Sequence, residues 1–235
     1  PGYFAGQTVL SQGTLVLAGG RNTLSPVYSS NNYLNINGGV LDLNGNVQTV
    51  SGLFSDSTAL NGGGLITVAM GSVSFESTRI PVNVTGPARE VLNEKVHVLD
   101  REFTFCAATI GNPHCVIPLP EISADLARRY GPALETHPNF PRKINVQFLR
   151  VIDRANIQIE IWERGAGETQ ASGSSSCAAA SAAVRLGLVK SPVTVKMPGG
   201  QLNIQVAPDF SLTMKGPVAE VARGALSPSF LRTLK

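Results

Sequence analysis

ERGAGETQASGSSSCAAASAAVRLG, residues 163–187, joins the end of a strand to a glycine-rich turn and then to a helix. Before it, Ile157–Trp162 alternates aliphatic and polar residues, which is the two-residue period of a half-buried strand. Ala178–Leu186 is dominated by alanine and carries almost no charge, which predicts a helix buried on nearly all sides. Gly187 is expected to end that helix. We therefore expect the fold to be built around one apolar helix.

The turn before this helix consists mainly of glycine, serine and threonine. A helix start presents free backbone N–H groups and the positive end of the helix dipole, which suits a carboxylate or a phosphate. A bound anion is one interpretation of the turn. The other, which composition alone favours, is that Ser172 or Ser174 only caps the helix.

Three segments resemble motifs of the diaminopimelate epimerase family and occur in the order found in that family. Residues 163–178 are similar to its second active-site motif, in which Glu-Arg-Gly-Ala-Gly-Glu-Thr precedes Ala-Cys-Gly-Thr-Gly-Ala-Cys-Ala. Gly111–Val116 (GNPHCV) is similar to its Gly-Asn-Pro-His turn, and Phe140–Val146 (FPRKINV) to its segment from Phe-Pro to Asn-Val. The resemblance is expected to begin near Met70 and to last to the end of the chain.

Residues 68–235 are expected to form a diaminopimelate-epimerase-like C-terminal domain of the α+β class. The resemblance implies a mixed curved sheet wrapped around a central buried helix, which is half of the family's fold. A second helix is predicted over Ser123–Tyr130, with Ser123 as N-cap and Gly131–Pro132 as the stop. The predicted strands are Val73–Phe75, Val82–Val84, Val96–Leu99, Phe103–Ala107, Cys115–Leu119, Ile144–Ile152, Ile157–Trp162, Val193–Met197, Leu202–Val206 and Ser211–Lys215.

Residues 1–67 differ from the rest in having almost no charge and many Asn, Gly, Ser and Thr residues. Short alternating runs at Gly13–Leu17 and Gly39–Gly45 resemble the strand repeats of autotransporter passenger domains, which stack as a parallel β-helix. An ordinary β-meander is the alternative. In the epimerase family a first domain with its own Cys-Gly-Asn-Gly motif would stand here, and the sequence before Cys106 contains no cysteine. The sequence thus looks like a β-rich segment fused to the second half of an epimerase.

Composition limits the classes of partner. Charged residues are 15% of the 235, and the net charge of +3 is not gathered into a basic cluster, so we expect no nucleic-acid partner. No apolar run is long enough to span a membrane. Cys106, Cys115 and Cys177 lack zinc-ligand spacing, which predicts free, mostly buried thiols in a reducing, cytoplasmic compartment. Pro1–Tyr3 shows neither a signal peptide nor an initiator methionine, so we expect the chain to start inside a longer product.

The resemblance implies catalysis without a cofactor, by two thiols on opposite faces of a substrate α-carbon. The position of the family's catalytic thiol falls on Ser172, whose hydroxyl is much harder to deprotonate. Cys177 matches a later cysteine of the family and is expected to be structural rather than a displaced nucleophile. Two explanations of Ser172 stay open. The site binds without turnover, or serine plays a weaker acid role opposite a cysteine of a missing domain.

The other positions that match the family's motifs are binding positions. The resemblance implies that Asn112 and Asn145 contact the distal amino-acid group of the substrate, and that Glu163 and Arg164 surround its ammonium and carboxylate groups. It assigns Gly173 and Ser174 to the backbone donors at the helix start. Without the motif, Glu163 and Arg164 would be read as a surface ion pair. His114 is either a proton relay or a structural residue, and Trp162 is expected to pack under the site.

The sequence leaves three functional hypotheses. The first is an amino-acid epimerase or racemase of the diaminopimelate type, an isomerase that converts LL- to meso-diaminopimelate for lysine and cell-wall precursor synthesis, incomplete or impaired in this chain. The second is a catalytically inactive amino-acid-binding or interaction domain. The third is a fragment of a secreted β-helical surface protein. The first two imply a small-molecule amino-acid partner, no nucleic acid and no membrane, with a homodimer left open.

Overall fold

The computed structural model describes residues 64–218 and, before them, only the backbones of five short strands; its side chains are described for residues 67–217. The chain divides into two compact units, one made of Pro1–Thr67 with Pro217–Lys235 and the other of Val68–Gly216. Strand β6 (Gly64–Ser72) begins in the first unit and ends in the second.

The described strands of the first unit pair in parallel. β1, β3 and β5 form one series, and β2, β4 and the start of β6 form another. A β-meander joins antiparallel neighbours, so the meander alternative is wrong for these strands. The autotransporter-like β-helix expected for residues 1–67 lies largely outside the described residues. The strands are β1 (Thr8–Leu10), β2 (Thr14–Val16), β3 (Tyr33–Ile36), β4 (Val40–Asp42) and β5 (Gly52–Phe54).

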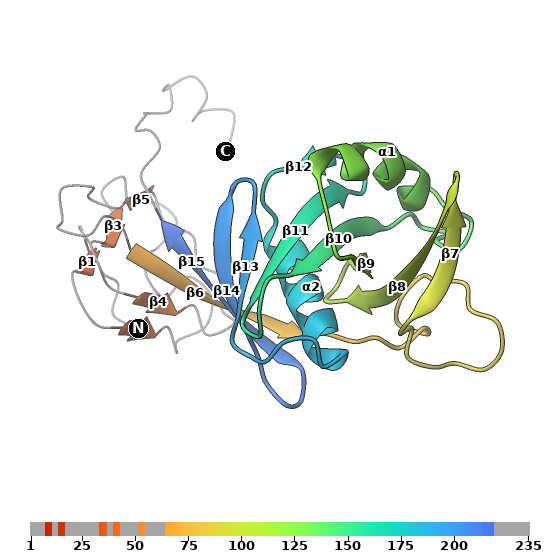
Figure 1. Cartoon of the computed structure of the whole chain (residues 1–235). Coiled ribbons are helices and arrows are strands. Elements are labelled where there is room, and N and C mark those ends of the chain that lie inside the picture. The colour runs from red at the N-terminus through yellow and green to blue at the C-terminus, as the bar shows by residue number, and fades with distance from the viewer. Residues whose placement is uncertain are drawn as a thin grey trace, which may run out of the picture. The chain divides into compact units, whose positions relative to one another are not determined.

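The second unit contains one mixed sheet and two helices, which confirms the α+β class (Figure 1). Its strands follow the order β15-β14-β13-β11-β10-β9-β8-β7, with β12 beside β11. The pairs β9–β10 and β11–β13 are parallel, and the other pairs along this order are antiparallel. The elements are β7 (Glu94–Val98), β8 (Arg101–Thr109), β9 (Pro113–Pro118), α1 (Ala124–Glu135), β10 (Asn145–Val151), β11 (Asn156–Glu163), β12 (Gly167–Thr169), α2 (Gly173–Arg185), β13 (Val193–Met197), β14 (Gly200–Val206) and β15 (Ser211–Val218).

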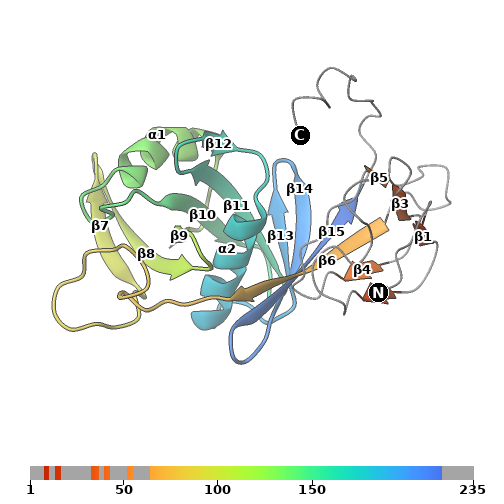
Figure 2. The same ribbon diagram turned by 180° about the vertical axis from the view of Figure 1, so that it is seen from behind.

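The two helices pack on opposite faces of the sheet (Figures 1 and 2). Along β8, Cys106 joins the core around α2, whereas its neighbours Phe105 and Ala107 join the core around α1. The same alternation occurs along β9, where Val116 faces the α2 side. Since successive strand residues point to opposite faces, one sheet supplies both cores.

Helix α2 is the central buried helix that the sequence predicts. Residues 175–183 are all buried, and they pack against strands β8 to β11, β13 and β14. Small side chains allow this, because an alanine-rich helix can approach a sheet closely. The helix ends as expected near Gly187, whose φ of 71° suits glycine.

Helix α1 is longer than predicted. Its N-cap is Ser123, whose Oγ accepts a hydrogen bond from the backbone N–H of Leu126 at 3.1 Å, as expected. It does not stop at Gly131–Pro132 but continues to Glu135. A Cβ added at Gly131 would lie 2.5 Å from Trp162 Cγ. This glycine therefore serves close packing on β11, and not helix termination.

Two predicted strands are absent or reduced. Ser74 takes part only in an isolated bridge to Thr109, and Val82–Val84 has no strand pairing. Val73, Phe75 and Val82 are nevertheless buried. The alternating apolar pattern of these segments indicates only that the side chains contact the core. Residues of a loop can make the same contacts as residues of a strand.

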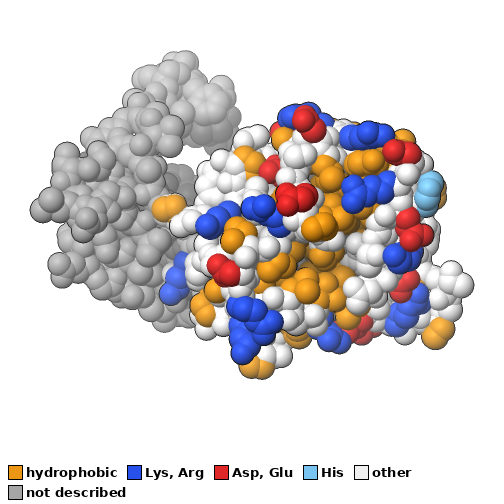
Figure 3. Space-filling view, in the orientation of Figure 1, with side chains coloured by type: hydrophobic (Ala, Val, Ile, Leu, Met, Phe, Trp, Pro, Cys, Tyr) orange, Lys and Arg blue, Asp and Glu red, His pale blue; other side chains and the backbone are white. Residues whose placement is uncertain are grey.

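On the face of the second unit seen in Figure 3, hydrophobic side chains gather at the centre, and Lys, Arg, Asp and Glu of both signs surround them. No helix among the described residues is long and apolar enough to cross a membrane.

Candidate functional site

The start of α2 forms the centre of the candidate site. Ser172 is extended, and its Oγ accepts a hydrogen bond from Ser175 N at 3.4 Å, which makes it the N-cap. Its backbone carbonyl accepts from Ser176 N (3.1 Å) and Ser176 Oγ (2.8 Å). The first N–H groups of a helix, here those of Gly173 and Ser174, have no acceptor within the helix. With the helix dipole, they can hold a carboxylate.

Ser172 thus caps the helix, as composition alone suggests. This cap and an anion site are compatible, since the cap uses the N–H of Ser175 and leaves the preceding two donors. Ser172 N lies 3.5 Å from Met197 Sδ, which is a weak acceptor. Among the described residues, no histidine, lysine or carboxylate forms a hydrogen bond with Ser172.

The turn before β9 reaches the start of α2. Asn112 Nδ2 donates to Ser174 Oγ at 3.4 Å, and Asn112 Oδ1 lies 3.0 Å from His114 Nε2. Because an amide oxygen only accepts, His114 Nε2 carries the proton in this contact. The hydrogen bond from His114 therefore fixes the orientation of the Asn112 side chain.

His114 is structural in this arrangement. Its side chain is fully buried, and burial lowers its pKa to about 4. The nearby amide of Gln147 opposes this shift, and the positive charge of Arg164 adds to it. A neutral, enclosed imidazole that donates to Asn112 does not fit the proton-relay interpretation.

Gln147 and Ser175 form a buried pair that the sequence analysis missed. Gln147 Nε2 donates to Ser175 Oγ at 3.1 Å, and both side chains are fully buried. Gln147 Oε1 and His114 Nδ1 have no partner among the described residues. Turning the Gln147 amide over would offer Nε2 to His114 and Oε1 to the Ser175 hydroxyl. A glutamine inside the apolar run of β10 is the signal that could have found this pair.

Asn145 joins two motifs. Its Nδ2 donates to Pro113 O at 2.8 Å, and its Oδ1 accepts from Arg164 N at 3.0 Å. The side chain links the turn of Asn112 to the turn after β11 and leaves this residue only 7% exposed. Its expected contact with a ligand stays a prediction.

Glu163 and Arg164 stand at the end of β11. Glu163 Oε2 accepts from Thr169 Oγ1 at 3.3 Å, and Arg164 Nη1 donates to Arg142 O at 3.2 Å. Neither side chain forms an ion pair with any residue of the described range 67–217. The surface ion-pair interpretation is therefore wrong, and both charges can serve a ligand.

The three thiols are unsuited to acid–base chemistry. All are free and buried, as predicted. Burial raises the pKa of Cys177 to about 12, and it also raises the pKa of Cys106 and Cys115. Cys177 is thus a core residue and not a displaced nucleophile. Within residues 67–217, no group of three or more His, Cys, Asp and Glu side chains could hold a metal ion.

Hydrogen bonds link most of the predicted site. Ser174 contacts Asn112, and Pro113 of the same turn contacts Asn145, which contacts Arg164. Glu163 precedes Arg164, and Ser172 and Gly173 begin α2. The start of α2 and the turn that carries Arg164 are thus connected through the turn of Asn112 and through Asn145.

Comparison with known proteins identifies the relatives of this domain. Residues 106–221 match the family model "Diaminopimelate epimerase". The chain is 52% identical over 189 residues to "Diaminopimelate epimerase 2" of Nostoc sp.. This alignment covers 80% of this chain and 66% of that protein. It is 43% identical over 162 residues to the diaminopimelate epimerase of Azotobacter vinelandii, covering 68% of this chain and 58% of that one. This chain spans less than two thirds of the length of either relative.

The alignment to the Nostoc protein corrects one expectation. Its 189 residues exceed the 168 that follow Thr67, so the similarity starts before Val68 and not near Met70. These matches give no support to autotransporter repeats. A solved structure of a predicted epimerase from Pseudomonas aeruginosa is 20% identical, with a TM-score of 0.47, and covers 72% of this chain and 61% of that one.

Proposed function

We propose that this chain supplies the second half of a cofactor-independent amino-acid epimerase of the diaminopimelate type, acting in the cytoplasm in lysine and cell-wall precursor synthesis. The observation that carries the proposal is the series of hydrogen bonds that joins Ser174 at the α2 start to the Asn112–Pro113 turn, and that turn through Asn145 to Arg164. The relatives named diaminopimelate epimerase support the same substrate class.

In this proposal the site recognises the amino-acid group of its ligand. The N–H groups of Gly173 and Ser174 take the α-carboxylate at the positive end of α2. Glu163 and Arg164 provide one charge of each sign for the ammonium and carboxylate groups. Asn112, held by His114, supplies an amide at the edge of the same site.

Ser172 limits the chemistry. An alkoxide is far more basic than a thiolate, so deprotonation of the Ser172 hydroxyl needs a strong neighbouring base. Among the described residues, the hydrogen-bond partners of Ser172 are N–H and O–H groups and a thioether, and none of them is such a base. We therefore propose that this half binds the amino acid and, at most, offers Ser172 as a weak acid, so turnover is impaired.

Exchange of the substrate α-proton tests the proposal. In heavy water, one thiolate can remove the α-proton and return a deuteron from the same side, so a half-site can give exchange without inversion. We expect the natural chain to bind diaminopimelate with very slow exchange by proton NMR, and Ser172→Cys to accelerate exchange at least tenfold. Ser172→Ala is the matched control and should bind but not exchange.

Two outcomes would contradict this proposal. Absence of binding by the natural chain removes the amino-acid site. Binding without any gain in Ser172→Cys would mean that position 172 does not face the α-carbon, which leaves an inactive amino-acid-binding domain as the function.

A further inference from the structure

Glu135 is a buried carboxylate in an unfavourable place. It is the last residue of α1, and it is only 7% exposed. A negative charge at a helix C-terminus faces the negative end of the helix dipole. A buried carboxylate at such a position needs strong compensating partners.

Three donors supply that compensation. Trp162 Nε1 lies 2.8 Å from Oε2, and Gly165 N and Lys143 Nζ lie 3.1 Å and 3.4 Å from Oε1. Burial acts to raise the pKa of Glu135, but these hydrogen bonds and the charge of Lys143 together lower it below its ordinary value. Glu135 is therefore ionised at neutral pH.

One of these donors belongs to the turn that carries Arg164. Glu135 holds the N–H of Gly165, and Asn145 holds the N–H of Arg164 itself. Two successive N–H groups of the turn are thus fixed by side chains from outside it. By contrast, the exposed Arg164 side chain has one described hydrogen bond, to Arg142 O.

We propose that Glu135 is a positioning residue for Arg164. By binding Gly165 N, it fixes the backbone next to Arg164, just after β11. This directs the Arg164 side chain to the anionic group of the ligand. The inference rests on the proposed function, because it assigns Arg164 to a ligand. The main chain at Gly165, with φ of 78°, can follow this path at little cost because it is a glycine.

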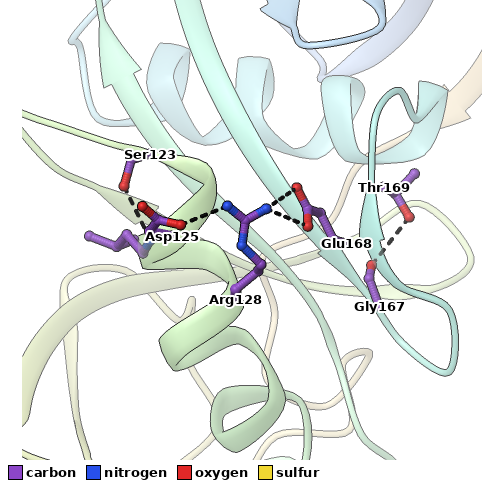
Figure 4. A network of polar contacts seen from close by, with 7 residues as sticks. Ser123, Asp125, Arg128, Gly167, Glu168 and Thr169 are labelled. Carbon is purple, nitrogen blue, oxygen red and sulfur yellow. Dashed lines mark hydrogen bonds and ion pairs between the residues drawn. The ribbon is translucent and has the colours of Figure 1, made fainter.

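The ion pair that joins α1 to β12 provides a control. Arg128 on α1 binds both oxygens of Glu168 on β12, at 3.0 and 2.8 Å, and also contacts Asp125 (Figure 4). This pair ties the β11–β12 hairpin to α1 without touching residues 163–165. If Glu135 only anchored the hairpin, Glu168→Gln would have the effect of Glu135→Gln.

The test measures the Kd of meso-diaminopimelate by calorimetry for the full chain. Glutamine keeps one acceptor for three donors and loses the charge that attracts Lys143, so Glu135→Gln should weaken binding about tenfold, and Glu168→Gln less than twofold. Arg164→Ala should weaken it by tenfold or more. Because Glu135 acts through Arg164, the double variant should bind like Arg164→Ala alone.

Two further readouts keep the test decisive. Trp162 is the only tryptophan, and its emission should change in Glu135→Gln but not in Glu168→Gln. Glu135→Asp keeps the charge but withdraws it by one methylene, so it should weaken binding even if Glu135→Gln does not fold.

The outcomes separate this inference from the proposed function. If the natural chain binds and Glu135→Asp or Glu135→Gln binds equally well, the positioning role is wrong while the function stands. Additive effects in the double variant would also overturn it, since they would show that Glu135 acts independently of Arg164. If the natural chain does not bind, both fail.

Discussion

Mild acid should destabilise this protein through His114. The imidazole is fully buried, donates through Nε2 to Asn112, and has its pKa lowered to about 4 mainly by burial. In the unfolded chain the same side chain regains an ordinary pKa of about 6.5. Between these two values the unfolded chain takes up a proton that the folded chain does not.

The size of the effect follows from proton linkage. Above the unfolded pKa of about 6.5, His114 is neutral in both the folded and the unfolded chain, so its titration does not change the free energy of unfolding. As the pH falls through the window from about 6.5 to about 4, each unit removes about 1.4 kcal/mol from the free energy of unfolding. Across the whole window the loss is roughly 3 kcal/mol, a large part of the 5–15 kcal/mol that typically stabilises a domain.

Urea unfolding followed by Trp162 fluorescence measures this loss. The natural chain should lose about 1.4 kcal/mol for each pH unit between about pH 6.5 and 5. His114→Gln keeps a donor for Asn112 but has no titrating ring, so its stability should change much less with pH. His97→Gln, at an exposed position of β7, is the matched control and should keep the slope of the natural chain. Equal slopes in all three proteins would refute the reasoning.

Three other predictions concern packing and ionisation. Gly131→Ala should lower the free energy of unfolding by about 2 kcal/mol, because its Cβ would lie 2.5 Å from Trp162 Cγ and overpacking outweighs the better helix propensity; an unchanged Tm would contradict this. The raised pKa of Cys177, about 12, predicts that a thiol reagent at neutral pH reacts far more slowly with the folded chain than with the chain in urea; rapid labelling of the folded chain would argue against burial. Because the pKa of Glu135 is lowered, its contribution to stability is present above its ordinary pKa and is lost as the pH falls through the folded value. Trp162 emission should therefore stay constant from neutral pH to about pH 4.5 and change only below it, and a transition at higher pH would mean that the carboxylate is not held as described.

Local patterns were sufficient where neighbours along the chain decide the structure. The N-cap roles of Ser123 and Ser172 and the end of α2 near Gly187 depend on residues within one helical turn. The alternation of Ile157–Trp162 marked β11 correctly for the same reason. The resemblance to the family's motifs also indicated that the Asn112 turn and the start of α2 lie together.

Patterns that have two physical meanings misled the prediction. Gly131 and Pro132 resemble a helix stop, yet α1 continues because the glycine is needed against Trp162. Val82–Val84 looks like a strand, but apolar residues in a loop also pack into the core. The buried pair of Gln147 and Ser175 was not predicted at all, because its members lie on β10 and α2, 28 residues apart in the chain.

The sequence by itself determined the α+β class, the central helix and the residue types gathered at its start, because these depend on short-range periodicity and on motif order. Only the tertiary structure decided which polar side chains are buried and which neighbours hold them, as Glu135 shows. The three partners of Glu135 lie 8, 27 and 30 residues away from it in the chain, one before β10 and two at the end of β11 and in the turn that follows. Burial and hydrogen bonding between such segments arise when the sheet closes around its helices, and they set both the pKa of Glu135 and the path of the turn that carries Arg164.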